Sequence, residues 1–438
     1  MRDAFSRLSR LVLGAVFALL LLIPGPAAAQ DAGAMTVLPV ALTLEAALAR
    51  ALGNNPDLTA QAEELRAREA EAWQAGLRPN PVLALEAENL LGSGNFAGAD
   101  LAETTLVVSQ AVELGGKRLR RRDLAEAAVA VGLSEYHQAR ADVLADTEGR
   151  FVAVLAAQRR LELADELAAL ANRIAGTVEE RIAAGNAAAT EGLRVRIQWL
   201  ELESRREKSR RELVAVRSRL AALLGQETAD FDLVVGALTP TPDLPDLTEL
   251  EGLVEKGPWP ARQVAEVDNR RRSLDLEQAR RYPDLEIGLG TRYLAESEDT
   301  ALVFGISVPL PIFNRNQGAI AAARSRLAKA RAQERGARVQ AKAAITAAWQ
   351  EGHAARAEAE ILQHEIIPAS RQALAAAEYG YQAGKFPIFD VLDAQRVLVE
   401  AQSGHLDALV DYHRACITIK RLLGRVPAAS GTEPVSKE

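Results

Sequence analysis

An internal repeat divides this chain into two halves of the same design. Pro81 and Pro283, which each precede a strand-like run, are 283 − 81 = 202 residues apart. Gly185 and Gly384 end two similar segments and are 384 − 185 = 199 residues apart. The Leu-Leu-Gly triplets that close the halves keep the same offset, 424 − 225 = 199. Ordered landmarks at a nearly constant offset indicate that one structural unit occurs twice.

Each half contains a stretch suited to a very long helix. The predicted order is a helical lead-in, two strand-like runs, a long helix and a return helix. No proline occurs between Pro81 and Pro240, as an uninterrupted helix requires. The run from Lys117 to Ala184 has 184 − 117 + 1 = 68 residues, roughly 100 Å of helix at 1.5 Å per residue. Pro368 lies inside the second long helix and is expected to kink it.

The composition fits long helices better than one wide core. Aromatic residues make up 4% of the 438 residues and alanine is abundant. Alanine is a strong helix former and lets helices approach closely. The net charge is −7, and removal of residues 1–29, which carry +2, gives −7 − 2 = −9. An acidic chain of this kind is a poor ligand for nucleic acid.

The first residues have the pattern of a secretory signal. Arg2, Arg7 and Arg10 precede an apolar run from Leu11 to Ile23, and small residues follow at 27–29. This pattern is typical of a cleaved signal peptide. The expected parts of the chain are a signal peptide at 1–29, a first structural repeat at 30–226, a linker at 227–246, a second structural repeat at 247–425 and a flexible tail at 426–438.

Four runs of strand-like character, 82–91, 104–114, 284–294 and 302–310, alternate between apolar and other residues. Each is about ten residues long, the length of a tilted transmembrane strand. No stretch after the signal approaches the length of an apolar transmembrane helix. Four strands alone do not close a barrel, and an open sheet is not stable in lipid. Either several copies share one barrel, or the runs form soluble hairpins that cap a coiled coil.

The order of elements, the duplication and two segments resemble the TolC family of outer-membrane factors. The segments Ser109–Arg118 and Val308–Gly318 are similar to its heavy-metal, CzcC-like branch. The resemblance covers nearly the whole mature chain. It implies a mainly α fold with β-structure in a TolC-like trimer. Each chain would contribute four strands to one 12-stranded outer-membrane β-barrel. This β-barrel would continue as a long periplasmic α-helical barrel.

This resemblance also implies a function and partners. The chain is expected to be the outer-membrane exit channel of a tripartite efflux pump for divalent heavy-metal cations, and not an enzyme. Expected partners are two further copies, a periplasmic adaptor protein, an inner-membrane transporter of the resistance-nodulation-division (RND) type and outer-membrane lipid. No cofactor and no nucleic acid are expected. The tip turns at Gly185 and Gly384 would contact the adaptor. Two alternatives are a drug-efflux or type I secretion duct, and a periplasmic coiled-coil scaffold without a pore.

Asp390 and Asp393 are the strongest candidates for a gate. Their i, i+3 spacing places them on one face of a helix. In the family a matching pair faces the pore at its narrow periplasmic end, so three chains would form two rings of carboxylates that attract cations. The alternative is a capping and helix-dipole role. The equivalent residues of the first half are Glu191 and Arg194, so the acidic pair is not duplicated.

Tyr381 matches a tyrosine of the family's gate-latching network. The arginine expected beside it is absent: Phe386 takes its place, and the neighbouring Lys385 is the candidate substitute. The basic run from Lys117 to Arg122 is expected to be a solvated face, with contact to lipid headgroups as the functional alternative.

Metal-binding and catalytic motifs are nearly missing from the sequence. His413 and Cys416, at i and i+3, could share a metal, although a lone pair of this kind on one helix more often serves packing. Two methionines, Met1 and Met35, do not suffice for a thioether ladder. No phosphate loop, nucleophile elbow or HExxH motif occurs. The sequence therefore supports no metal site, no cofactor and no catalytic residue.

Overall fold

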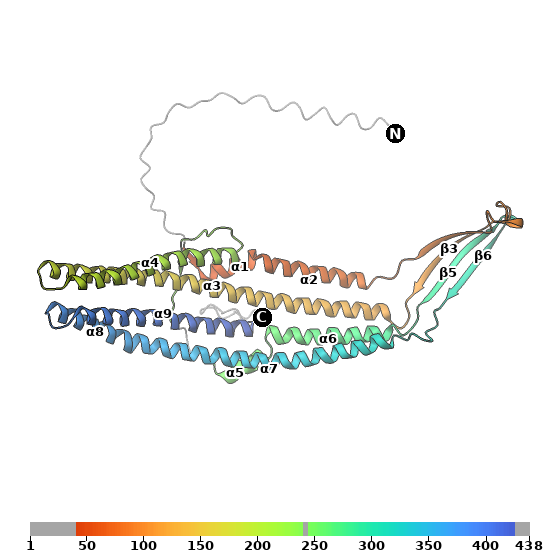
Figure 1. The fold of residues 1–438 in the computed structure, drawn as a ribbon. Helices are drawn as coiled ribbons and strands as arrows, with labels where there is room; N and C mark the ends of the chain where they lie inside the picture. The colour runs from red at the N-terminus through yellow and green to blue at the C-terminus, as the bar shows by residue number, and fades with distance from the viewer. Residues whose placement is uncertain (1–40, 240–243, 425–438) are drawn as a thin grey trace, which may run out of the picture. The chain divides into compact units, whose positions relative to one another are not determined.

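The computed structural model describes residues 41–239 and 244–424, all within one compact unit, Val40–Glu438. The expected signal peptide and tail lie outside the described residues, as do Pro240 and Pro242 of the linker. Within the described chain, long helices lie side by side. The larger sheet stands at one end of these helices and two helix-to-helix turns stand at the other (Figure 1).

The two halves repeat one order of elements, with small additions. The first comprises β1 (Ala41–Thr43), α1 (Leu44–Asn54), α2 (Pro56–Ala75), β2 (Val82–Glu88), the 3₁₀ turn η1 (Gly94–Phe96), β3 (Glu103–Val112), α3 (Lys117–Ala183), α4 (Ala189–Leu223) and β4 (Leu233–Val235). The second comprises α5 (Leu247–Val254), α6 (Pro258–Ala279), β5 (Leu285–Leu294), β6 (Asp299–Ser307), α7 (Gln317–Ile361), the π-helical turn η2 (Leu362–Ile366), α8 (Ile367–Gln382) and α9 (Ile388–Leu423).

The long helix of the first half, α3, is continuous over 67 residues, as its lack of proline predicts. The lead-in helices break where Asn55 precedes Pro56. The Asn55 side chain accepts the Leu58 N–H at 3.0 Å and donates to the Leu223 carbonyl at 3.0 Å. One side chain therefore caps α2 and joins it to the end of α4.

The second long helix is interrupted before Pro368. Regular α-helix ends at Ile361, and the π turn Leu362–Ile366 leads into α8, with Pro368 in its first turn. Proline has no N–H to donate, and its ring clashes with the carbonyl four residues earlier. A single π turn widens the helix at that point and removes the conflict. The expected irregularity is present as a π turn that separates two helices.

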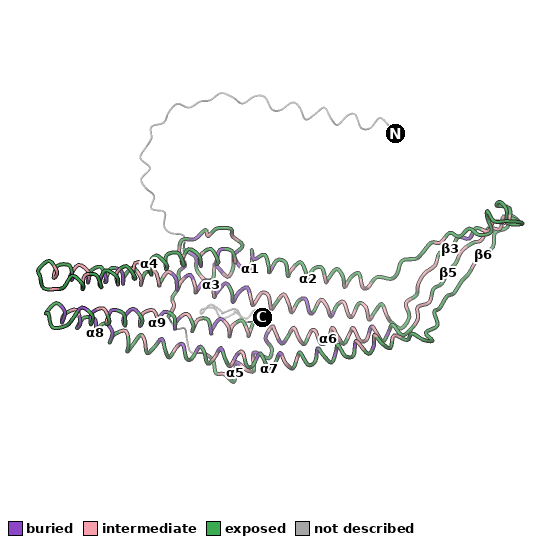
Figure 2. The backbone as a smooth tube through the Cα atoms, viewed as in Figure 1, coloured by how far each residue is buried: buried purple, intermediate pink, exposed green. Residues whose placement is uncertain are grey.

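The core consists of narrow seams between helices. One seam joins β1, α1, α3, α4 and β4 around Phe151, Leu220 and Phe231. Another joins α5, α7 and α9 around Leu250 and Ile345. Many of the remaining buried residues are alanines, which allow close helix contact. Burial follows the helix contacts, while the strands are largely exposed (Figure 2).

Sheet pairing occurs in two places and joins the halves in one of them. β1 and β4 form a parallel pair that ties the linker to the start of the described chain. The larger sheet has the order β2-β3-β5-β6 and is antiparallel throughout, so the hairpins of the two halves meet at β3 and β5. No described helix combines the length and apolar character needed to cross a membrane.

Candidate functional site

The larger sheet has one strongly apolar face. Directly paired residues of an antiparallel sheet lie on the same face. Leu83 pairs with Val108, Val108 with Leu289, and Leu289 with Phe304, which makes an apolar row across all four strands. Leu289 and Phe304 are 61% and 64% exposed. The alternation seen along each run is therefore aligned across the sheet.

The opposite face carries the charged and polar side chains of the sheet. Gly288 and Gly305 pair there and contribute no side chains. The Arg292 guanidinium forms an ion pair with Glu103 at 2.8 Å and donates to the Thr105 hydroxyl at 2.9 Å. The sheet thus separates an apolar side from a charged, water-compatible side, as a wall between lipid and an aqueous pore requires.

The edges of this sheet are open within the described chain. β2 and β6 are its outer strands, and neither pairs with a further strand. Unpaired strand edges in lipid are costly, because each exposed N–H and C=O lacks a partner. Both outer strands therefore have an edge at which another strand can pair.

The tips of the two helical hairpins use the same turn. Gly185 and Gly384 have φ values of 73° and 69°, in the left-handed region that glycine adopts without strain. Asn186 N–H donates to the Arg181 carbonyl, and Lys385 N–H to the Gly380 carbonyl, both at 2.8 Å. These are the bonds of a Schellman motif. The repeat predicted from sequence therefore extends to the geometry of the turns.

Tyr381 is the central residue of the tips. It is 5% exposed, and its hydroxyl donates to Glu191 Oε2 of α4 at 2.9 Å. Burial, and then the hydrogen bond and negative charge of Glu191, raise the pKa of Tyr381 to about 12. The apolar part of the side chain lies in a cluster with Val178, Val195 and Ile388. Tyr381 therefore joins the hairpin of the second half to that of the first.

Arg181 provides the cation that the sequence left unassigned. Its guanidinium carbon lies 4.6 Å from the centre of the Tyr381 ring. Its Nη1 donates to the carbonyls of Tyr381 at 2.6 Å and Gln382 at 2.9 Å. Lys385, the expected substitute, is exposed and forms no ion pair within the described chain. Phe386 lies against Gly380 in place of the missing arginine.

Neither Arg181 nor Glu191 was predicted from the sequence to belong to this contact. The available signal was their offset from the second half: Glu191 stands 390 − 191 = 199 residues before Asp390, and Arg181 stands 380 − 181 = 199 residues before Gly380, the neighbour of Tyr381. A latch across the two repeats becomes apparent only when the two tips are seen in contact.

Asp390 and Asp393 lie in the first turns of α9 and are exposed. The N-cap is Pro387, without a side-chain cap, so neither aspartate is the N-cap residue. Asp393 forms an ion pair with Arg396 at 2.7 Å. In a single chain the pair is thus solvent-facing, half neutralised and unconnected to the Tyr381 contact.

His413 and Cys416 lie in the interior of the helical contacts. Burial lowers the pKa of His413 and raises that of Cys416, which disfavours imidazolium and thiolate alike. No cluster of three or more metal-ligating side chains occurs in the described residues. The environment is that of packing residues.

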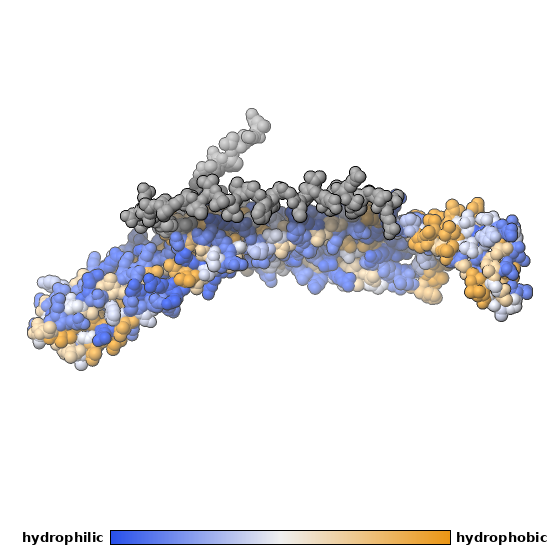
Figure 3. All heavy atoms as spheres, turned by 90° about the horizontal axis from the view of Figure 1, so that it is seen from above, coloured by the Kyte–Doolittle hydropathy of each residue, from blue (hydrophilic) through white to orange (hydrophobic). Residues whose placement is uncertain are grey.

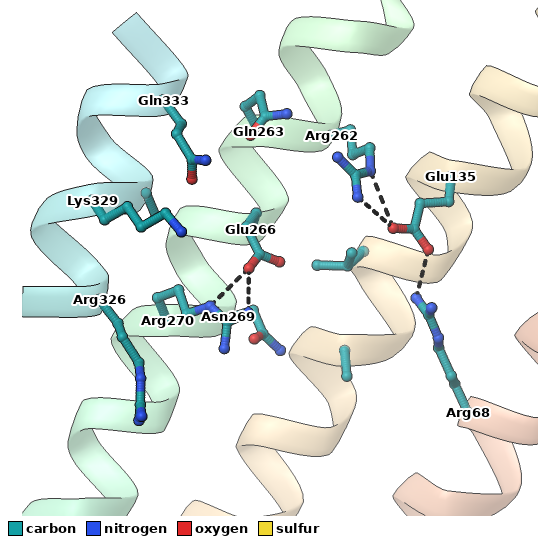
Figure 4. Close-up of a pocket in the computed structure, with 13 residues that line it drawn as sticks. Arg68, Glu135, Arg262, Gln263, Glu266, Asn269, Arg270, Arg326, Lys329 and Gln333 are labelled. Carbon is teal, nitrogen blue, oxygen red and sulfur yellow. Dashed lines mark hydrogen bonds and ion pairs between the residues drawn. The ribbon is translucent and has the colours of Figure 1, made fainter. Parts of the chain in front are cut away.

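An ion-pair network joins the lead-in helices of both halves to α3 (Figure 4). Glu135 of α3 accepts from Arg68 of α2 at 2.9 Å and from Arg262 of α6 at 2.8 Å. Burial acts to raise the pKa of Glu135, but the hydrogen bond from Arg262 and the charge of Arg68 outweigh it, and the pKa is lowered. A cavity of about 670 Å³ adjoins the network, and Arg326 and Lys329 of α7 line its far side.

Comparison with known proteins agrees with this geometry. The chain matches the family described as outer membrane efflux protein over residues 47–226 and 261–425. It is 34% identical over 423 residues to the cobalt-zinc-cadmium resistance protein CzcC of Cupriavidus metallidurans, covering 95% of this chain and all of that one. It is 28% identical to the nickel-cobalt-cadmium resistance protein NccC of Alcaligenes xylosoxydans xylosoxydans, covering 75% of this chain and 72% of that one.

The fold is similar to that of CusC, whose crystal structures concern transmembrane channel formation. The TM-score is 0.77 at 18% identity, over 90% of this chain and 95% of that one. The fold is thus TolC-like. The chain belongs to the outer membrane efflux protein family. The predicted family, fold class and outer-membrane location are confirmed.

Proposed function

We propose that three copies of this chain close one outer-membrane β-barrel and form the exit duct of a tripartite efflux pump. The observation that carries the proposal is the two-faced, open-edged sheet. With β6 of one copy beside β2 of the next, both edges of every sheet are paired. Twelve strands then surround a pore lined by the face that carries Arg292, with the Leu289 and Phe304 face toward lipid.

The proposed cargo is divalent heavy-metal cations. The support is that relatives along most of this chain are named for resistance to cobalt, zinc, cadmium and nickel. The proposed partners are a periplasmic adaptor, which would meet the turns at Gly185 and Gly384, and an inner-membrane transporter of the RND type. A drug or polypeptide cargo has no comparable support among these relatives. A cell that lacks the protein should become sensitive to zinc, cobalt and cadmium but not to drugs, and expression of the chain should restore resistance.

The tip is the proposed gate. The contacts of Tyr381 with Glu191 and Arg181 hold the two hairpins of one chain together. Asp390 and Asp393 would form the acidic rings at the narrow end of the trimer. Replacement of both aspartates by neutral residues is therefore expected to change the block of conductance by multivalent cations, while the pore still conducts.

Single-channel recording in planar bilayers tests the pore and the rings together. The wild type is expected to show cation-preferring conductance that multivalent cations block from the periplasmic side. Asp390→Ala/Asp393→Ala should relieve the block by at least tenfold, because two rings of charge are lost. Glu400→Ala is the matched control, since this exposed acid of α9 also binds Arg396, at 2.9 Å. If the block is unchanged in the double variant, Asp390 and Asp393 do not form the gate. If the protein is soluble and shows no conductance, it is not a channel.

A further inference from the structure

The long helices form one layer that has two outer edges. Next to the sheet, α2 contacts α3, α3 contacts α6 and α6 contacts α7, so α2 and α7 are the outermost helices (Figure 1). Toward the tips the corresponding order is α4, α3, α9 and α8. We call the two sides the α2–α4 edge and the α7–α8 edge. Each edge helix has a neighbour in the layer on one side, and its other side is open to another molecule.

The burial pattern identifies the outward side of each edge helix. In α7, Leu327 is 7% exposed and faces the layer. Ser325 and Lys329 lie two residues before and after it, about 200° around the helix, and both are exposed. In α2, Leu65 points at Gly132 of α3, and Ala67, two residues later, is exposed. Lys329, Ser325 and Ala67 therefore face away from the layer.

Next to the sheet, the α2–α4 edge is acidic. Five acidic residues of α2 are exposed: Asp57, Glu63, Glu64, Glu69 and Glu71. The helix has two basic residues, Arg66 and Arg68, so its net charge is 2 − 5 = −3.

At the same level, the α7–α8 edge is basic. The level is set by the cavity that Arg68 of α2 and Arg326 of α7 both line. Six basic residues in the first part of α7, residues 317–340, are exposed: Arg324, Arg326, Lys329, Arg331, Arg335 and Arg338. The one acid of this part is Glu334, so its net charge is 6 − 1 = +5. Glu334 pairs with Arg338 at 2.7 Å, and the other five cations form no ion pair within the described chain.

Toward the tips the signs are reversed. α4 has nine basic and five acidic residues, a net charge of 9 − 5 = +4. The opposite edge there, residues 341–382, has three basic and five acidic residues, a net charge of 3 − 5 = −2. The α2–α4 edge is turned toward the viewer in Figure 3, where hydrophilic residues predominate on the uncovered surface of the helices. The two edges are thus complementary in charge along both parts of the layer.

We propose that the α2–α4 edge of one copy packs against the α7–α8 edge of the next, and that opposite charge selects this head-to-tail pairing. The proposal rests on the proposed trimer, in which every sheet enters the membrane at the same end. Copies are then parallel, so two like edges would bring charges of the same sign together, whereas unlike edges bring opposite charges together. A head-to-tail interface of this kind can close into a ring.

The same pairing agrees with the connections between helices and strands. α2 leads into β2, and α7 follows β6. When β6 of one copy lies beside β2 of the next, α7 and α2 are brought to the same boundary. Small outward residues such as Ala67 and Ser325 leave room for the two helices to approach each other.

Disulfide cross-linking of the detergent-purified protein tests the pairing of the edges. The native Cys416 is buried, so the introduced cysteines are the accessible ones. Ala67→Cys combined with Ser325→Cys, or with Ala332→Cys two turns further along α7, is expected to give covalent dimers and trimers, since a disulfide needs Cα atoms within about 7 Å. Ala67→Cys/Arg271→Cys is the matched control, because Arg271 is exposed on α6, inside the layer, and it should give none.

A charge reversal tests whether opposite charge selects the pairing. Lys329→Glu is expected to lower the trimer fraction about threefold, because an acid then faces the acidic α2. Arg271→Glu makes the same change of charge away from the edges and should leave the trimer fraction unchanged. The difference should shrink at roughly 0.5 M salt, where exposed charges are screened. Size-exclusion chromatography with light scattering measures the fraction, and circular dichroism confirms that each variant is folded.

Three results would overturn the inference. A trimer that neither cysteine pair cross-links has other edges in contact, and cross-linking by Ala67→Cys alone would mean that like edges meet. Equal trimer fractions for Lys329→Glu and Arg271→Glu would show that charge does not select the pairing. Each of these outcomes leaves a conducting trimer intact, whereas a wild type that is monomeric and does not conduct would refute the proposed channel itself.

Discussion

Tyr381 connects parts of the chain that are far apart in sequence. Its hydroxyl binds Glu191 of the first repeat, and Arg181 contacts both its ring and its carbonyl. A buried hydrogen bond to a charged acceptor contributes about 1.5–3 kcal/mol. The contact is local, so we expect its loss to loosen the tip without unfolding the chain.

Tyr381→Phe is predicted to raise the opening of the tip about tenfold, since roughly 1.4 kcal/mol corresponds to a factor of ten. Hydrogen exchange of the amides of α8 and α9 measures this opening. Tyr379→Phe is the control, because Tyr379 is two residues earlier and 72% exposed. Equal exchange in the two variants would show that the hydroxyl contributes nothing to the tip.

The tip should also lose stability at high pH. The folded pKa of Tyr381 is raised to about 12 from an ordinary value of 10.0. Its contribution is complete below the ordinary pKa and disappears as the pH rises through about 12. Exchange should therefore accelerate between these values in the wild type, and the accelerating part should be absent from Tyr381→Phe. The difference between the two proteins removes the titration of other groups.

At the scale of elements, Glu135 joins three helices. Arg68 of α2 and Arg262 of α6 both bind it, and the side chain of Glu135 is 24% exposed. Partial exposure weakens such pairs through solvent screening. The network thus aligns the lead-in helices on α3 more than it stabilises the whole chain.

Glu135→Gln is predicted to lower the free energy of unfolding by about 1 kcal/mol, because two arginines lose their partner in a partly exposed site. The pKa of Glu135 is lowered from 4.5, so its contribution is present above that value and lost as the pH falls below it. Denaturant unfolding at pH 7 and pH 3 measures both effects. Glu63→Gln, which breaks only an exposed pair with Arg66, should change stability by a few tenths of that. If the free energies of unfolding of the wild type and Glu135→Gln differ by the same amount at pH 7 and pH 3, the ionised Glu135 carboxylate is not the source of the stabilisation.

At the scale of the whole molecule, the two faces of the larger sheet differ in the side chains that they present. Adjacent residues of β6 belong to opposite faces: Phe304 pairs with Leu289 on the apolar face, and Val303 with Gly290 on the polar face. The same substitution at these neighbours therefore tests the orientation of the sheet with little change in composition.

Phe304→Lys is predicted to destabilise the inserted protein by about 2–4 kcal/mol, the cost of a cation on the lipid face of a strand near the bilayer midplane. Val303→Lys is the control and should insert normally, because Gly290 opposite it leaves room and the side chain would face water. The amount of protein in the outer-membrane fraction measures insertion. Equal loss in both variants would refute the assignment of faces.

The long helices and strands were predictable because their signals are local. The proline-free stretch placed α3 to within one residue of its end, and alternation located all four strands of the larger sheet. The tip contact was not predictable, since Arg181 and Tyr381 are 381 − 181 = 200 residues apart. Because position 386 is phenylalanine and not arginine, the sequence indicated Lys385 as the cation near Tyr381. In the structure this cation is Arg181, which belongs to the first repeat.

The sequence by itself determined the duplication, the long helices, the strand alternation and the resemblance to outer-membrane factors. These follow from proline placement, periodicity and repeated motifs, each of which acts over a few residues at a time. The tertiary structure alone decided which strands pair, that the Glu191 and Tyr381 side chains meet, and that Arg281 shares a pocket with Phe313. Such contacts depend on the packing of two repeats against each other, and no local pattern encodes the distance between residues that the chain brings together only on folding.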